Sequence, residues 1–288
     1  MTKTSVIIPC KNEQETIGDL VHSLKKLTII DEIIVVDDGS TDNTGSILSE
    51  SDIKVVTHLY SKGNGAAIKR GAREASGDIL VFMDADGQHE INDIHKLLDA
   101  IEDGYDMAVG ARDNKSQASA ARLVGNKLYN RLASLITGHK ILDLTSGFRA
   151  SKRKYFLDYI SLLPNGFSYP TTITMAFIKS GHSVKYIPIK VRKREGKGHL
   201  SILRDGVRFF LIIFKVGTLY SPLKIFAPIS AFLFSSGLLY YLYTYLTADR
   251  FTNMSMLLLT ISVFIFIFGL ISEQITMLIY LNIKDKHS

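Results

Sequence analysis

GDILVFMDADGQHE, residues 77–90, is the stretch that decides the expected fold of this chain. Four apolar residues, 79–82, form a short β-rich run that leads into two aspartates, Asp84 and Asp86, one residue apart. In an extended backbone, residues i and i+2 point to the same side, so both carboxylates can face one cation. The stretch predicts a buried strand that delivers two acids to its carboxyl end.

The first 110 residues repeat this alternation of strand and helix. The predicted strands are SVIIPC (5–10), EIIVVDD (32–38), IKVVTHL (53–59), DILVFMD (78–84) and DMAVGA (106–111). Helical patterns lie between them at 14–27 and 91–104, and a further one covers 115–136. Strands that alternate with helices predict an α/β layer with a largely parallel sheet.

Polar residues gather where the predicted strands end. Residues 11–13 follow the first strand, 37–42 the second and 84–89 the fourth. Ligands of open α/β sheets bind outside the carboxyl ends of the strands, so these segments predict a site. An Asp-x-Asp-Gly turn on its own is more often a solvated surface turn. The prediction of a site therefore depends on the order and spacing of all these motifs together.

Two segments of the chain, 84–88 and 61–71, suit a nucleotide diphosphate. Asp84 and Asp86 are hard oxygen ligands of the kind that Mg²⁺ or Mn²⁺ prefers, and Gln88 adds a neutral oxygen. The segment SKGNGAAIKRG brings a lysine and close glycines to the start of a helix, a setting suited to anionic oxygens. GNGAAI lacks the third glycine of a dinucleotide fingerprint, so it does not predict dinucleotide binding.

Composition narrows the class of protein. The 288 residues carry a formal net charge of +6, and the one cysteine, Cys10, excludes an intrachain disulfide. The apolar run at the N-terminus is too short for a signal peptide. The sequence offers no arginine-aromatic platform for nucleic acid, so no nucleic-acid partner is expected.

The C-terminal part predicts a membrane anchor. No charged residue lies between Lys224 and Asp249 or between Met254 and Glu273, and about 20 apolar residues span a bilayer. The predicted domains are 1–199 for the α/β domain, 200–221 for an amphipathic interface helix and 222–288 for a transmembrane hairpin with spans at 223–247 and 254–276. An ordinary packing helix is the alternative for 200–221.

Lysines flank the hairpin, whereas its short loop carries one arginine, Arg250. The positive-inside rule therefore predicts an integral membrane protein of two spans, with the large domain and both termini in the cytoplasm. Glu273 lies inside the second span or near its end. It is interpreted as an interfacial acid or a helix-packing residue, with a functional role as the alternative.

The motifs together resemble family 2 glycosyltransferases of the GT-A fold, and most of all the membrane-bound polyprenyl-phosphate mannose and glucose synthases. The matching segments are SVIIPCKNE, VVDDGSTD, KGNGAAIKRG, MDADGQH, GAR, LTSGFR and the basic run before the hairpin. The resemblance implies metal-dependent, inverting transfer of a hexosyl group. The donor would be GDP-mannose or a UDP-hexose, and the acceptor polyprenyl or dolichyl phosphate in the lipid bilayer.

The resemblance also implies roles for single residues. The implied donor-binding residues are Pro9, Glu13, Asp38, Lys62, Gly65, Asp84, Ala85, Asp86, Arg192 and Arg194. The implied acceptor-phosphate residues are Arg112, Arg122 and Ser146, the metal ligands are Asp84, Asp86 and Gln88, and the catalytic residues are Asp84, Asp86 and Arg112. The basic motif departs from the usual pattern, because GKGHLS replaces its Ser-Lys ending. A solvated or lipid-facing role is the alternative for Arg122, Arg192 and Arg194.

The lack of an acidic general base in the expected segment supports a phosphate as the acceptor. Glycan-extending relatives place an acidic base after the TSGF-like segment, whereas residues 166–181 contain no carboxylate. A phosphate monoester has a second pKa of about 6 and is ionised without help. Asp143 is kept as an alternative base.

The rival functions are a glycosyltransferase that extends a polysaccharide or lipid-linked glycan and a non-catalytic nucleotide-sugar-binding subunit. Processive synthases carry a Gln-x-x-Arg-Trp element, and this chain has no tryptophan. The sequence leaves a homo-oligomer open.

Overall fold

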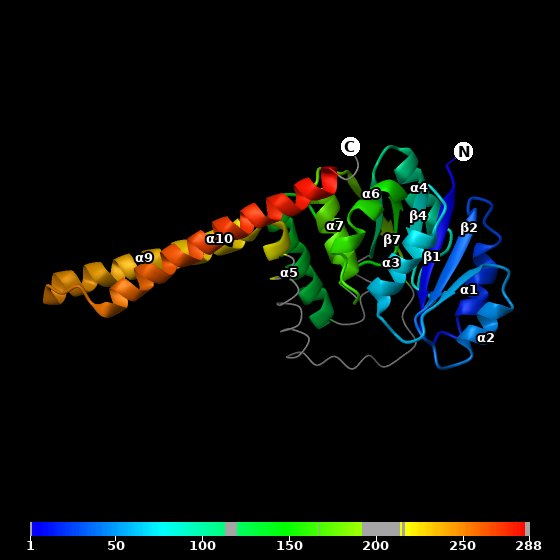
Figure 1. The fold of residues 1–288 in the computed structure, drawn as a ribbon, viewed down its shortest axis with the longest axis horizontal. Helices are drawn as coiled ribbons and strands as arrows, with labels where there is room; N and C mark the ends of the chain where they lie inside the picture. The colour runs from blue at the N-terminus through cyan, green and yellow to red at the C-terminus, as the bar shows by residue number, and fades with distance from the viewer. Residues whose placement is uncertain (1, 113–119, 167, 192–213, 215–216, 286–288) are drawn as a thin grey trace. The chain divides into compact units, whose positions relative to one another are not determined.

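The structure is a computed structural model that describes residues 2–112, 120–166, 168–191, 214 and 217–285 (Figure 1). The chain forms two compact units, Met1–Phe209 and Phe210–Ser288. The first unit holds the sheet, and the second holds two long helices. Most of the predicted interface helix, residues 200–213, 215 and 216, lies outside the described residues, so that helix stays a prediction.

Seven strands form one sheet in the order β3-β2-β1-β4-β6-β5-β7. Their bounds are β1 Thr4–Cys10, β2 Glu32–Asp37, β3 Lys54–Thr57, β4 Ile79–Phe82, β5 Met107–Arg112, β6 Arg149–Lys152 and β7 Val184–Ile189. The first five match the predicted strands, and the sheet is largely parallel as predicted. β6 and β7 were not predicted, and β6 runs antiparallel to both of its neighbours.

The helices of the first unit lie between the strands along the chain. They are α1 Ile17–Leu24, α2 Thr44–Ser49, α3 Asn64–Glu74, α4 Asp93–Glu102, α5 Ala120–Thr137, α6 Arg153–Asp158 and α7 Tyr169–Lys179, with a short 3-10 helix at Ile160–Leu162. α1 and α4 fall inside the two helices predicted between strands, and α5 occupies most of the predicted 115–136 segment.

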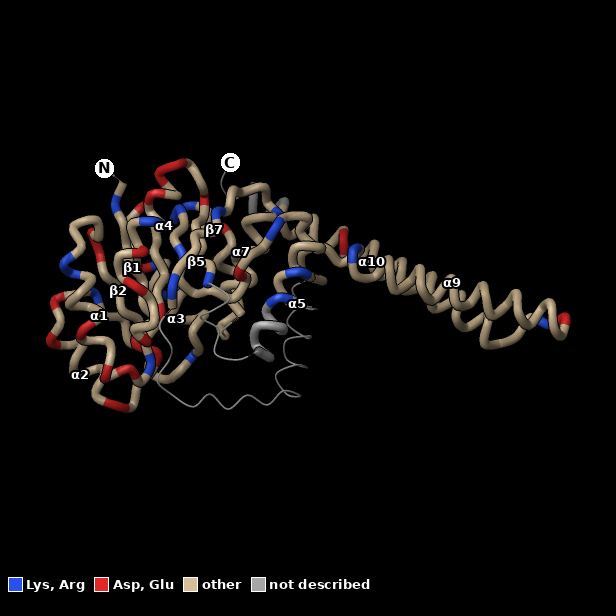
Figure 2. Tube along the Cα trace, turned by 180° about the vertical axis from the view of Figure 1, so that it is seen from behind, with Lys and Arg blue, Asp and Glu red and all other residues tan. Residues whose placement is uncertain are grey.

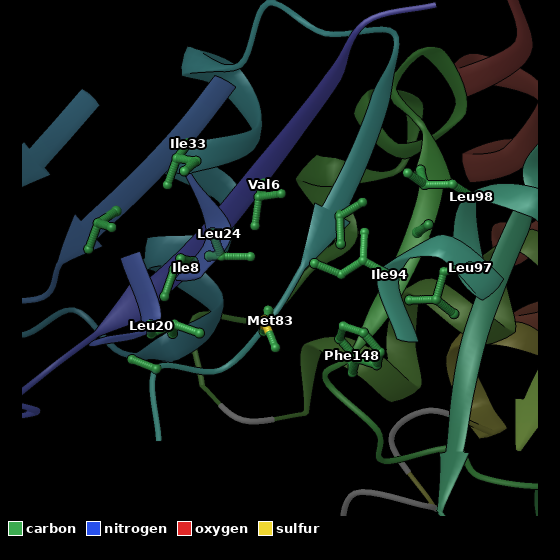
Figure 3. Packing of buried hydrophobic residues seen from close by; sticks show 14 of the residues in the cluster. Val6, Ile8, Leu20, Leu24, Ile33, Met83, Ile94, Leu97, Leu98 and Phe148 are labelled. Atoms are coloured by element: carbon green, nitrogen blue, oxygen red, sulfur yellow. The ribbon is translucent and has the colours of Figure 1, made fainter. Parts of the chain in front are cut away.

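The core on one face of the sheet joins the strands to α1, α2 and α4 (Figure 3). Val6 and Ile8 of β1 pack with Leu20 and Leu24 of α1, because alternate strand residues share one face. α3 lies close against β1, where a Cβ on Gly71 would come within 2.5 Å of the Ile7 side chain. This packing places the carboxyl ends of β1, β2 and β4 side by side.

The second unit is a pair of helices, α9 Pro222–Ala248 and α10 Asn253–Asp285. Both are long and apolar enough to cross a membrane, and only 11% and 17% of their apolar windows are buried. Figure 2 shows almost no charged residue along their middle parts. Ser230 of α9 donates a hydrogen bond to the carbonyl of Ser262 on α10 at 2.8 Å, so the two helices contact each other directly.

Glu273 has a helix-packing role in this hairpin. Its Oε2 accepts a hydrogen bond from the backbone N–H of Leu223 at 3.2 Å. Leu223 lies in the first turn of α9, where amide groups have no partner inside the helix. Ser221, the N-cap residue, makes no side-chain cap hydrogen bond, so a carboxylate from the neighbouring helix takes that part.

Candidate functional site

Three strand ends meet at one edge of the sheet. β1 pairs in parallel with β2 and with β4, so Cys10 lies opposite Asp37 and Ile7 lies opposite Phe82. The segments that follow these strands therefore start from neighbouring positions. The structure brings together the polar segments after residues 10, 37 and 82, as the sequence predicts.

The turns after β1 and β2 are tied to each other. Asn12 has a positive φ of 54°, a conformation that asparagine adopts more readily than most residues. Its Oδ1 accepts a hydrogen bond from the N–H of Thr41 at 2.8 Å. The N–H of Glu13 donates to the hydroxyl of Thr44 at 2.9 Å. Pro9 is buried in β1, and Glu13 is half-buried beside this junction.

Asp38 anchors a neighbouring loop. Its carboxylate accepts hydrogen bonds from the N–H groups of Lys62 and Gly63 at 2.8 Å each, from the Ser61 hydroxyl at 2.7 Å and from His58 Nδ1 at 2.7 Å. Burial opposes its ionisation, but these hydrogen bonds outweigh burial and hold its pKa below the ordinary value. Contact with a nucleotide stays a prediction for Asp38, and the structure gives it a task that the sequence did not indicate.

The glycines at the start of α3 have a packing reason. A Cβ on Gly65 would lie 2.1 Å from the carbonyl oxygen of Pro164, and one on Gly63 would lie 2.5 Å from that of Asn165. The N–H of Ala66 donates to the Asn165 carbonyl at 3.1 Å, so this amide is already paired. Lys62 is exposed, and its Nζ lies 5.5 Å from the ring centroid of Tyr60. Donor binding by Lys62 and Gly65 stays a prediction.

Asp84 and Asp86 follow β4. Both are half-buried, and Ala85 between them is buried. The Thr16 hydroxyl donates to the Ala85 carbonyl at 2.7 Å, and the N–H of Gln88 donates to Asp86 Oδ1 at 3.2 Å, so the turn is fixed on both sides. Burial and then the charge of Asp86 raise the pKa of Asp84 to about 6.

Asp84, Asp86 and Gln88 fit a divalent cation that is also coordinated by oxygens of the enzyme's substrate. The charge of Asp86 raises the pKa of Asp84, and a cation between the two carboxylates would relieve this repulsion. Within the described residues, no group of three or more His, Cys, Asp or Glu side chains could hold a metal ion. A Mg²⁺ or Mn²⁺ ion needs about six oxygens, so Asp84, Asp86 and Gln88 would share it with water and phosphate oxygens.

Arg112 lies at the end of β5 in a fixed orientation. Its Nε and Nη2 donate to the two oxygens of Asp143 at 2.7 and 2.9 Å, and Nη2 also donates to the Thr145 hydroxyl at 2.5 Å. No hydrogen bond of Nη1 to another described residue is present. The charge of Arg112 also acts on Asp84. The guanidinium is thus fixed where its charge acts on Asp84, with Nη1 unpaired among the described residues.

Asp143 is poorly suited to act as a base. Burial opposes its ionisation, but the hydrogen bonds and the charge of Arg112 outweigh burial and hold its pKa below the ordinary value. Both of its oxygens already accept hydrogen bonds. A carboxylate with a lowered pKa and occupied oxygens takes up a proton only with difficulty.

The remaining predicted residues are placed in different ways. Ser146 is buried, and its hydroxyl donates to the Phe148 carbonyl at 3.5 Å. Arg122 lies in α5, with its side chain outside the described residues, and Arg192 and Arg194 lie outside them altogether. Their roles stay predictions.

Two residues beside Asp84 were not selected from the sequence. Asn64, the first residue of α3, donates a side-chain hydrogen bond to Asp84, and its Oδ1 is buried without a partner. Arg149, at the start of β6, is fully buried, and its charge acts on Asp84. The signal for Arg149 was an arginine at the end of LTSGFR, a motif whose Gly147 lies against Asp84.

Comparison with known proteins places these motifs in a family. The model of "Glycosyl transferase family 2" matches residues 5–160, and that of "GtrB C-terminal hairpin" matches residues 221–278. The chain is 30% identical to Glycosyltransferase AglJ of Haloferax volcanii, over 81% of this chain and 78% of the relative. It is 34% identical to polyprenol monophosphomannose synthase of Mycolicibacterium smegmatis, over 67% of this chain and 78% of the relative.

Solved structures agree on the fold. Glucosyl-3-phosphoglycerate synthase from Mycobacterium tuberculosis, in complex with Mn²⁺, UDP-glucose and phosphoglyceric acid, aligns with a TM-score of 0.62. The alignment covers 75% of this chain and 80% of that one at 23% identity. The GT-A-like sheet expected from the sequence is thereby confirmed, and the matched hairpin indicates membrane anchoring.

Proposed function

Because the chain belongs to glycosyltransferase family 2, we propose that it transfers a hexosyl group from a nucleotide diphosphate sugar to polyprenyl or dolichyl phosphate. The chain is a glycosyltransferase, and the proposal concerns its donor, acceptor and site. Relatives named polyprenol monophosphomannose synthase and dolichol-phosphate mannosyltransferase support the acceptor class.

The contact between Arg112 and Asp143 is the main support for a phosphate acceptor. A bidentate contact to Asp143 at 2.7 and 2.9 Å fixes the guanidinium, and Nη1 donates to no other residue in the described part of the chain. Planar guanidinium groups suit phosphate, which they bind through two donors at once. The same contact removes Asp143 as a base. The described part of the site therefore has a cation for an anionic acceptor, and Asp143 does not supply the base that a sugar hydroxyl would require.

The donor side is proposed at the ends of β1, β2 and β4. Pro9, Glu13, Asp38, Lys62 and Gly65 would contact the nucleotide, with Asp84, Ala85 and Asp86 near the diphosphate. Asp84, Asp86 and Gln88 would hold a Mg²⁺ or Mn²⁺ ion, which supplies positive charge to the diphosphate when bound. The Mn²⁺ and UDP-glucose named for the M. tuberculosis structure support this part of the proposal.

The chain's own residues would act by orientation and charge. Arg112 places the lipid phosphate beside the sugar, and the phosphate attacks without prior deprotonation because its second pKa is about 6. Arg122 and Ser146 are proposed to assist at the acceptor phosphate, and Arg192 and Arg194 at the donor. One displacement at the anomeric carbon inverts its configuration. Holding two reactants in line can supply most of the rate gain.

The hairpin explains how enzyme and lipid meet. A polyprenyl phosphate is confined to the bilayer, so an enzyme anchored in the same membrane encounters it at a raised effective concentration. The flanking lysines support a cytoplasmic catalytic domain with two spans. Nucleotide sugars of the cytoplasm would then reach the site directly.

The test uses membranes that contain the full chain. They are incubated with labelled GDP-mannose, UDP-glucose or UDP-N-acetylhexosamine and a polyprenyl phosphate, with Mn²⁺ or EDTA, and the lipids are then extracted. We expect a labelled glycolipid that disappears with EDTA and with Asp86→Ala. Asp99→Ala, an exposed acid on α4, is the matched control and should behave as wild type.

Two results would contradict the proposal. Label in a long water-soluble polymer alone would show an enzyme that extends glycans. If the wild-type chain and Asp99→Ala are both folded and bind the donor but form no product, the chain is a non-catalytic binding subunit.

A further inference from the structure

Arg149 is a buried cation that makes no ion pair with an acid in the described ranges of the chain. Its side chain has no exposed surface, and its hydrogen bonds go to neutral groups. Nη1 donates to the carbonyl of Pro170 at 3.1 Å and to the hydroxyl of Thr174 at 3.0 Å, and Nη2 donates to the carbonyl of Ser146. Its Nε is buried and has no hydrogen-bond partner among the residues that the structure describes, and burial lowers the pKa of the guanidinium. Burial of a charge without an opposite charge beside it is energetically unfavourable, so Arg149 is expected to have a specific role.

Its hydrogen bonds join two segments that are distant in sequence. One is the irregular segment of residues 146–148 before β6, called the turn from here on, and the other is the first two turns of α7, which contain Pro170 and Thr174. Tyr169 of α7 lies beneath the guanidinium, with its ring centroid 5.8 Å away, and its hydroxyl donates to the Gly147 carbonyl at 3.4 Å. Successive carbonyls of the turn are therefore held from the protein interior.

The outer side of the same turn contacts the acids. A Cβ on Gly147 would lie 2.8 Å from Asp84 Oδ2, so the backbone there touches the carboxylate. Peptide groups are planar and trans, so the N–H of Gly147 points away from the Ser146 carbonyl and from Arg149. Thr145, one residue before the turn, accepts a hydrogen bond from Arg112. The turn therefore connects Asp84 with Arg112.

We propose that Arg149 is a positioning residue: through the backbone of Ser146 and Gly147, it sets the spacing between Asp84 and the acceptor-phosphate site at Arg112. This inference rests on the proposed function, because it assigns Arg112 to a phosphate monoester. Arg149 does not touch the substrate. It holds the part of the backbone that separates the leaving diphosphate from the attacking phosphate.

The geometry requires arginine at this place. The planar guanidinium donates in two directions at once, to Ser146 on one side and to the first turn of α7 on the other. A lysine ammonium is a point charge on a flexible chain and lacks that fixed fork. Arg149→Lys keeps the charge but loses the simultaneous contact. Only the position of the turn should then change.

The experiment compares Arg149→Lys, Tyr169→Phe and the control Thr174→Val in purified full-length protein. Thr174→Val removes an acceptor of Arg149 that does not belong to the turn. We expect Arg149→Lys to lower kcat/KM for the lipid phosphate by about 10- to 100-fold, the usual range for losing a hydrogen bond from a charged donor. Tyr169→Phe should give a smaller loss with the same pattern. The donor KM should stay within about twofold of wild type in all three, the margin that a nearly unchanged binding free energy allows.

A second measurement separates positioning from stability. Calorimetry of a short, water-soluble isoprenyl phosphate binding to each protein should show weaker binding for Arg149→Lys and wild-type binding for Thr174→Val. Nucleoside diphosphate binding with Mn²⁺ should be unchanged in both.

Equal isoprenyl phosphate binding in Arg149→Lys and wild type, or equal losses on donor and acceptor sides, would overturn the positioning role. Failure of the proposed function gives a different result, since wild type would then neither bind the isoprenyl phosphate nor form glycolipid.

Discussion

Gly147→Ala tests the contact between the turn and the acids. The new methyl would lie 2.8 Å from Asp84 Oδ2, closer than real Cβ atoms come to a neighbouring atom, and 3.3 Å from Oδ1, which is a tight contact. The carboxylate must withdraw by roughly 0.5 Å to reach ordinary contact. Overpacking of this kind costs about 1–3 kcal/mol, and a displaced catalytic group loses rate steeply, up to about 100-fold for 1 Å. We expect kcat to fall by at least about tenfold.

The assay is the initial rate of glycolipid formation as a function of Mn²⁺ concentration. Because Asp84 is a proposed metal ligand, Gly147→Ala should need more Mn²⁺ for half-maximal rate. Gly166→Ala is the matched control, since a Cβ there meets nothing within 4 Å and φ is not positive. If folded Gly147→Ala has the wild-type rate and Mn²⁺ dependence, the contact between Gly147 and Asp84 is refuted. A loss of rate in Gly166→Ala would instead indicate a general effect of alanine in these segments.

Three further perturbations follow from the same structure. Asp143→Asn should free Arg112 and raise the acceptor KM about tenfold, as expected for a weakened charged contact; a loss of kcat above about 100-fold at unchanged KM would instead identify a base. Asp38 has a lowered pKa, so its contribution to stability is present above its unfolded value of about 3.9 and is lost as the pH falls through the folded value. Asp38→Asn should therefore melt lower than wild type at pH 7 and approach it at pH 3 in thermal scans, and parallel curves would contradict the hydrogen-bonded carboxylate. Glu273→Ala should lower the stability of the hairpin in detergent by about 1 kcal/mol, the usual value of a helix cap, while Glu273→Gln keeps an acceptor for Leu223 and most of the stability. Equal midpoints for Ala and Gln in denaturant titrations would exclude the cap.

Several parts of the site were predictable because they depend on nearby residues. The run at 79–82 has the β-branched and aromatic composition of a strand, and Asp84 and Asp86 follow it directly. Parallel strands end at the same edge, so the meeting of three polar segments followed from the strand assignments alone. The apolar length of the two spans likewise needs no distant contact.

Other features depend on contacts between distant segments. β6, RASK, has no apolar run although it lies inside the sheet between β4 and β5, and its Arg149 donates to neutral partners of α7. Nothing in its local pattern indicates a strand. Gly65 looked like part of an anion-binding helix start, whereas its closest neighbour is the carbonyl of Pro164, about a hundred residues later.

The sequence by itself determined the alternation of strands and helices, the pair of acids at a strand end and the apolar hairpin. Each of these follows from periodicity or composition over fewer than about 30 residues. Only the tertiary structure decided that Asp143 holds Arg112, that Asp38 holds the loop at 61–63 and that Arg149 holds the turn against Asp84. A hydrogen bond between distant segments depends on how the chain folds back on itself, and local residue patterns carry no record of that path.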